Sequence, residues 1–270
     1  MIHPLRATYR ALALYLSKSR AVETHFGTSR FDLLKASLHK GDVLLVDGSS
    51  RISTAIKYLT QSSWSHAALY VGDAMADLHP EFGPNVLIEA DVVEGVRALP
   101  LAAYRGMHTR ICRPVGLGSH EIDGVIAHVV NRLGQRYDMR NLFDLLRYLL
   151  PTPPLPGRWR RRLLELGSGE PTQAICSSLI AAAFHSARYP ILPAIEPEYR
   201  RMRGTRKARK EILRIRSSQL FTPRDFDISP FFLIVKPMIE RNFDPHLVRW
   251  VTRPPTDQHA PGARPGKPAA

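Results

Sequence analysis

The segment WSHAALYVGD, residues 64–73, decides the fold predicted for this chain. The stretch Ser65–Gly72 within it is short, largely apolar and closed by a glycine, which is typical of a β-strand. His66 lies near the start of this strand, and the residues that follow it are small. Taken alone, a histidine in this setting is better explained by a structural place on the surface or in the core than by catalysis.

Short strand-like and helical runs surround this segment. Before it, Asp42–Asp47 is predicted to be a strand and Ser50–Leu59 a short helix. After it, two further strands are predicted at Val86–Val96 and Thr109–Val115. The remaining predictions are a helix with apolar residues repeating at three and four from Ile122 to Leu133, a helix over Asn141–Leu150, a helix in AICSSLIAAAF (residues 174–184) and a last strand in FFLIVKP (residues 231–237).

Composition narrows the class of protein. The 270 residues, 44% hydrophobic and 23% charged, are ordinary for a globular domain with extensions. The 38 Lys and Arg against 24 Asp and Glu leave a net charge of +14, which favours anionic partners without choosing among them. Only Cys112 and Cys176 are cysteines, so a disulfide framework and a four-thiolate zinc site are both excluded, and a reducing compartment fits best.

One central domain is predicted between two extensions. Residues 1–38 form an N-terminal helical extension whose apolar stripe suits either a helix packed on the domain or a helix lying in a membrane interface; the stripe contains Leu5, Tyr9, Leu12 and Leu16. The central domain spans residues 39–240, with a Pro- and Arg-rich insertion at 151–172 and a basic segment at 200–216. Residues 241–270 form a C-terminal extension that we expect to be disordered from about residue 253.

Three residue types along the chain could together support nucleophilic chemistry. If a helix begins near Ala174, Cys176 lies in its first turn, where free N–H groups and the helix dipole stabilise a thiolate and an oxyanion. A nucleophilic thiol also needs a base and a group that orients the base. His66 could be that base, and Glu89, on what should be the next strand, could orient it. Spacing alone leaves open that Cys176 is simply a small buried residue.

Several motifs in one order carry a more specific signal. They are GDVLLVDG at 41–48, WSHAALYVGD at 64–73, LIEADVVEGV at 87–96, GQRYD at 134–138, ICSSLI at 175–180 and TPRDFDISPFFLIVKP at 222–237. In that order they resemble the permuted branch of the NlpC-like superfamily, the YiiX/YebB-like cysteine hydrolases. The resemblance runs from about residue 40 to about residue 237. The insertion at 151–172 and the basic segment at 200–216 match no motif of that family.

This resemblance implies both a fold and a set of site residues. The implied fold is α+β: a circularly permuted papain-like domain whose antiparallel sheet, with the His and acid strands first, packs against a later cysteine-bearing helix. Cys176 would be the nucleophile, His66 the general base and acid, and Glu89 the orienting carboxylate. Tyr137 matches a tyrosine whose hydroxyl lies near the oxyanion, although a tyrosine packed under the cysteine helix would explain it equally well.

The expected function is therefore a thiol-dependent hydrolase that cleaves an amide or peptide-like bond, in a substrate that could be lipid-linked or derived from the cell envelope. No cofactor and no metal are expected. Two alternatives remain open at this point: a lipid acyltransferase of the lecithin retinol acyltransferase type, and a peripheral membrane protein with little catalysis.

Location and partners are predicted from what the sequence contains. The second alternative is motivated by Leu155 and Trp159 beside several arginines, a composition that suits an anionic membrane surface. Nucleic acid is not an expected partner, because no nucleic-acid-binding motif accompanies the basic segment. A cytoplasmic location is expected, with attachment to the inner face of the membrane as the further option.

Overall fold

The computed structural model describes residues 30–77, 80–91, 94–135, 175–200, 208–214, 217–218, 221–237 and 246. Its helices are α2 (Phe31–Ser37), α3 (Arg51–Thr60), α4 (Ser119–Val130), α7 (Ile175–Ser186) and α8 (Pro223–Asp227), with short 3-10 helices η1 (Pro80–Phe82) and η2 (Leu101–Tyr104). Its strands are β1 (Val43–Asp47), β2 (His66–Gly72), β3 (Val86–Asp91), β4 (Gly95–Pro100), β5 (His108–Pro114), β6 (Ala194–Arg200), β7 (Ala208–Arg214) and β8 (Phe232–Val235).

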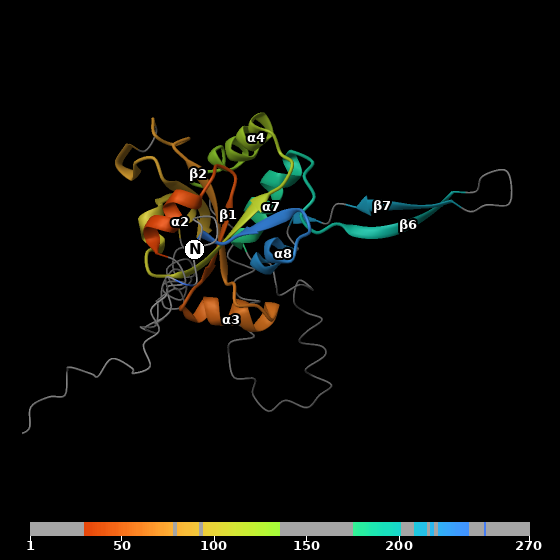
Figure 1. Ribbon diagram of the computed structural model, residues 1–270, viewed down its shortest axis with the longest axis horizontal. Coiled ribbons are helices and arrows are strands. Elements are labelled where there is room, and N and C mark those ends of the chain that lie inside the picture. The colour runs from red at the N-terminus through yellow and green to blue at the C-terminus, as the bar shows by residue number, and fades with distance from the viewer. Residues whose placement is uncertain are drawn as a thin grey trace, which may run out of the picture.

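A six-stranded sheet forms the centre of the molecule, in the order β4-β3-β2-β1-β5-β8. Every neighbouring pair in it is antiparallel. Strands β6 and β7 form a separate antiparallel hairpin, which extends away from the rest of the molecule in Figure 1. The mixture of helices with an antiparallel sheet confirms the predicted α+β class.

Both faces of the sheet are covered, because its strands are apolar on both sides. Val43 and Leu45 of β1 pack into one buried cluster, whereas Leu44 and Val46 pack into another, as the alternation of side chains along a strand requires. The first cluster includes residues of α4, α7 and α8, and the second includes residues of α2 and η2. The result is a sheet between two helical layers.

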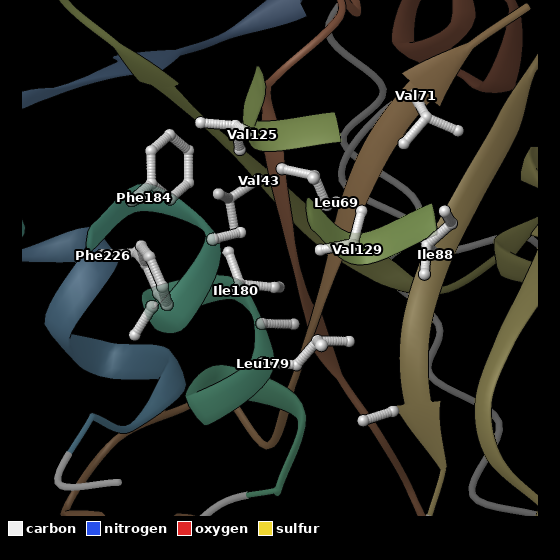
Figure 2. Packing of buried hydrophobic residues seen from close by; sticks show 14 of the residues in the cluster. Val43, Leu69, Val71, Ile88, Val125, Val129, Leu179, Ile180, Phe184 and Phe226 are labelled. Carbon is white, nitrogen blue, oxygen red and sulfur yellow. The ribbon is translucent and has the colours of Figure 1, made fainter. Parts of the chain in front are cut away.

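Helix α7 is the element that matters most for the site, and it is buried almost all round. Leu179, Ile180 and Phe184 are each at most 2% exposed, and Figure 2 shows them facing the sheet and α4. Phe184 also contacts the ring of Phe232 edge-on, with 5.2 Å between centroids. Fully burying side chains of this size is worth about 1.5–3 kcal/mol each, so α7 is firmly held on the sheet.

Most predicted elements in the described residues are confirmed within one or two positions, but one strand prediction is wrong. The run Val86–Val96 is not a single strand: it divides into β3 and β4, which pair with each other. The chain reverses because the Glu94 N–H donates to the Asp91 carboxylate and Gly95 adopts a φ of +82°, in the region that favours glycine. The sequence prediction treated EGV as part of the strand and missed this turn.

Other predictions fall partly or wholly outside the described residues. They are the apolar stripe of residues 5–16, Tyr137, the helix over 141–150, the insertion 151–172 and the tail from about residue 253. Within the described part of the basic segment, residues 208–214 form strand β7, for which no strand was predicted. Among the helices that the structure does describe, none has the length and apolar character needed to cross a bilayer.

Candidate active site

Cys176 is the second residue of helix α7 and is 4% exposed. The N–H groups in the first turn of an α-helix lack partners within the helix, so this position combines free donors with the positive end of the helix dipole. The thiol accepts a hydrogen bond from the backbone N–H of Ala67 and contacts the side chain of His66. The hydroxyl of Ser177, itself fully buried, lies 3.8 Å from the sulfur atom.

His66 is the first residue of β2, and the residues before it are fixed by hydrogen bonds. The Ser65 hydroxyl accepts from the Gly48 N–H at 2.9 Å and donates to the Val46 carbonyl at 3.3 Å, which ties the start of β2 to the end of β1. A Cβ atom at Gly48 would lie 2.4 Å from Ser53 Oγ and 2.9 Å from Ser65 Oγ, so a larger residue there would displace these hydroxyls. One step earlier, the indole N–H of Trp64 donates to Asp227 at 2.9 Å.

Glu89 reaches His66 across two neighbouring strands. Leu69 of β2 lies opposite Ile88 of β3, so the same register places Glu89 opposite Ala68 and diagonal to His66. The small side chain of Ala68 leaves room for the contact, and Glu89 Oε2 lies 2.5 Å from His66 Nε2. Because Nε2 faces the carboxylate, Nδ1 is the ring nitrogen left for Cys176.

Two further residues, Arg97 and Tyr104, bind the same carboxylate and were missed by the sequence reasoning. Arg97 lies directly opposite Glu89 in the β3–β4 pair, and its Nε and Nη2 donate to Oε1 at 2.8 and 2.7 Å. The hydroxyl of Tyr104, at the end of η2, donates to Oε2, the atom that also faces His66. Glu89 is only 3% exposed, so these contacts replace its lost hydration.

The charges of these groups shift their pKa values together. Burial alone would raise the pKa of Glu89, but His66, Tyr104 and Arg97 lower it to about 2. Burial alone would lower the pKa of His66, but the negative charges of Cys176 and Glu89 raise it well above its ordinary value. Burial alone would raise the pKa of Cys176, but the imidazolium of His66 and the hydrogen bonds to the sulfur lower it.

Taken together, these shifts favour a thiolate beside an imidazolium, with an ionised carboxylate behind the ring. A thiolate is the nucleophilic form of cysteine, and an imidazolium can return a proton to a leaving group. The side chain of His66 is 25% exposed, whereas Glu89 behind it is almost fully enclosed. With Cys176 only 4% exposed, the imidazole of His66 is the one member of this line that reaches solvent.

Of the four residues singled out from the sequence, the structure brings Cys176, His66 and Glu89 into one connected line, and Tyr137 lies outside the described residues. Arg97 could have been found if the turn before Gly95 had been recognised, because a hairpin there sets residues 89 and 97 opposite each other. Tyr104 gives no comparable signal, since its position depends on the 3-10 turn that follows β4.

Comparisons with known proteins add distant structural similarity alone. No family model and no curated protein matches the sequence. Among solved structures, the chain is similar to metalloprotein yiiX from Escherichia coli O157:H7, with 15% sequence identity, a TM-score of 0.44, and 73% of this chain and 96% of that chain covered. Similarity at this level does not extend to activity or to a bound metal. In the part of this chain that the structure describes, no three His, Cys, Asp or Glu side chains gather as a metal site would require.

Proposed function

We propose that this protein is a thiol-dependent hydrolase that cleaves an amide or peptide-like acyl bond through an acyl-enzyme on Cys176. One observation carries the proposal: a buried cysteine in the first turn of a helix contacts an imidazole whose Nε2 lies 2.5 Å from an ionised glutamate. Nucleophile, base and orienting acid in this order are the arrangement that thiol hydrolysis needs.

The first half of the reaction would form a thioester. The Cys176 thiolate attacks the carbonyl carbon, and the carbonyl oxygen becomes an oxyanion near the free N–H groups at the start of α7. When the tetrahedral intermediate collapses, the bond to the leaving nitrogen breaks and the His66 imidazolium supplies the proton that this nitrogen takes. The products are a free amine and an acyl group on the sulfur of Cys176.

The second half would release the acid. Neutral His66 removes a proton from a water molecule as the water oxygen attacks the thioester carbon, and the thiolate then leaves. The product is a carboxylic acid, and the thiolate–imidazolium pair is restored. Glu89 stays ionised throughout and holds Nε2, so that Nδ1 faces the sulfur in both halves.

We also infer that the domain is a papain-like fold in permuted order. In support of this, the strands that carry His66 and Glu89 precede α7 in the chain, and α7 packs against β2, β3 and α4 with its cysteine in the first turn. The hydroxyl of Tyr137 is proposed, from the resemblance of GQRYD, to lie near the oxyanion. The substrate is proposed to be a small amide or a peptide-like or lipid-linked molecule rather than nucleic acid.

Trapping the acyl-enzyme tests this function. The chain is incubated with a panel of acyl-amide, peptide and lipid-linked acyl substrates, quenched in acid and analysed by peptide mass mapping. We expect an acyl adduct on the peptide that contains Cys176 and release of the free acid, and adding a lipid or amine acceptor should not divert the acyl group. The proposal is contradicted if no substrate of the panel leaves an acyl adduct on the protein. It is also contradicted if the acyl group is transferred to the acceptor in place of water.

A further inference from the structure

The carboxylate of Glu89 has every acceptor position filled. A carboxylate offers about four lone-pair sites, two on each oxygen. Oε1 accepts from Nε and Nη2 of Arg97, and Oε2 accepts from Tyr104 and faces His66 Nε2. With both oxygens held on both sides, the group has no free rotation about its terminal bond. The direction in which it presents Oε2 to the imidazole is therefore set by Arg97 and Tyr104.

Arg97 is itself anchored at its other end. Its Nη1 lies 2.7 Å from Glu94 Oε2, and its Nη2 lies 3.4 Å from Asp91 Oδ2. Both acids belong to the reversal between β3 and β4, so the guanidinium is held by the same hairpin that carries Glu89. An arginine fixed at both ends presents its planar fork in one orientation.

Arg97 also supplies a positive charge directly beside Glu89. A thiolate, an imidazolium and a carboxylate in a row carry one net negative charge, and the guanidinium is the cation that faces it, with Asp91 and Glu94 on its outer side. Without the guanidinium, the nearly enclosed carboxylate of Glu89 and the thiolate of Cys176 would be two neighbouring anions with less positive charge beside them. Each anion would then be less stable.

Building on the proposed function of Cys176, we propose that Arg97 and Tyr104 are positioning residues for the reaction: together they lock Glu89 in the orientation that aims His66 at Cys176. Neither residue touches the thiol or the reacting bond. Their effect reaches the sulfur through Glu89 and then through the imidazole.

The groups that face this centre come from every element packed around it. They are His66 from β2, Arg97 from β4, Tyr104 from η2, Cys176 from α7, and the acids Asp91 and Glu94 that hold Arg97. Loss of Arg97 removes a positive charge and frees the carboxylate to turn away from the ring. Both consequences act on the thiol in the same direction, because each makes the thiolate less stable.

The pH profile of Cys176 alkylation measures this effect. Iodoacetamide rates at Cys176 are followed by peptide mass mapping from about pH 4 to about pH 9 in the full chain. In Arg97→Met the midpoint for thiolate formation should rise by about one pH unit relative to the natural chain. Tyr104→Phe, which removes one hydrogen bond and keeps the ring, should raise it by about half a unit. Arg97→Lys keeps the positive charge but lacks the paired N–H donors of a guanidinium. Its midpoint for thiolate formation should lie between those of Arg97→Met and the natural chain.

A matched control uses a second arginine of the sheet that binds a buried carboxylate through two nitrogens. Arg113 holds the buried Asp42 through Nε at 2.9 Å and Nη2 at 2.8 Å, so Arg113→Met removes the same kind of contact elsewhere. It should lower stability without moving the midpoint at Cys176. Unmoved midpoints in Tyr104→Phe and in whichever Arg97 variants fold would show a structural role only and overturn the inference. An ordinary midpoint near 8.5 in the natural chain would instead contradict the proposed function itself.

Discussion

The two cysteines of this chain are both buried and free, yet their surroundings push them in opposite directions. Cys112 lies in β5 between Val43 of β1 and Ile234 of β8 and is fully enclosed. Burial is the largest influence on it and raises the pKa of its thiol far above the ordinary value. Cys176 is almost as enclosed, but its pKa is lowered. Burial therefore does not decide the state of a thiol by itself.

The two thiols differ because Cys176 has a neighbouring imidazolium, His66, whose positive charge is stabilised by Glu89. His66 can stay protonated beside Cys176 because Glu89 stands behind its ring, and Glu89 can stay ionised because Arg97 and Tyr104 bind it. Cys112 has no such chain of partners: Arg110 lowers the pKa of its thiol, but burial and the negative charges of Asp227 and Asp42 act against it. Changes that remove one link should make Cys176 behave more like Cys112.

The largest expected effect comes from exchanging each cysteine for alanine. Cys176→Ala should reduce turnover of the acyl-amide substrate at least about a thousandfold, since no other group can form the thioester. Its stability should change by no more than about 1 kcal/mol, because alanine favours helix and the lost volume is small. Cys112→Ala should lose about 1 kcal/mol of stability through a small core cavity and keep its activity. Urea unfolding measures the stability of each variant, and initial rates measure its activity. Loss of activity in Cys112→Ala with full activity in Cys176→Ala would identify Cys112 as the nucleophile.

Removing the imidazole should make the two thiols nearly alike. In His66→Ala the pKa of Cys176 should move to or above that of a free cysteine, because burial then acts without the opposing charge. At about pH 6 its alkylation rate should fall by about a hundredfold. Mass mapping of the Cys176 peptide checks this, and an unchanged rate would mean that His66 does not stabilise the thiolate.

Glu89→Gln should have a smaller effect, of about tenfold on kcat. The amide oxygen of glutamine can still face the imidazole. Both oxygens of Glu89 accept hydrogen bonds, one from Arg97 and the other from Tyr104, so the NH₂ group of glutamine would replace an acceptor with a donor at one of these contacts. The loss should appear in kcat more than in KM, because substrate does not touch this carboxylate. A loss confined to KM would place Glu89 in substrate binding.

Glu89 should also make the stability of the folded protein depend on pH in the acid range. The folded pKa of Glu89, about 2, lies below its unfolded value near 4.3, so its contribution is complete above about pH 5 and is lost as pH falls toward about 2. The loss should be on the order of 3 kcal/mol in the natural chain and absent in Glu89→Gln. Urea unfolding over that range measures it, and an equal acid loss in Glu89→Gln would show that other groups carry it.

The pKa of Asp42 is shifted in the direction opposite to that of Glu89, so its effect on stability in acid is opposite as well. Its pKa is raised, chiefly by burial, so its protonation favours the folded state and its contribution is present in acid and is lost as pH rises through its folded pKa. Asp42→Asn should therefore show a steeper acid loss than the natural chain. A shallower loss in Asp42→Asn would indicate that Arg113 outweighs burial there.

Much of the sheet and the line from Cys176 to Glu89 followed from the sequence, because glycine and proline mark the ends of its strands and the ordered motifs resemble a known family. The β3–β4 turn was missed because the apolar residues on either side of EG look continuous. Without the turn, Arg97 could not be placed. Strands β6 and β7 were missed because Pro197 and a dense run of basic residues are both unusual in a strand.

Competition between the two cysteines in one native protein tests the central claim most directly. Limiting iodoacetamide at about pH 6, followed by peptide mass mapping, should label Cys176 well before Cys112, because only Cys176 has a pKa lowered toward that range. The preference should shrink in His66→Ala and vanish in denaturant. Rapid labelling of Cys112 with Cys176 inert in the native protein would contradict the account and make Cys176 a structural thiol of a buried helix.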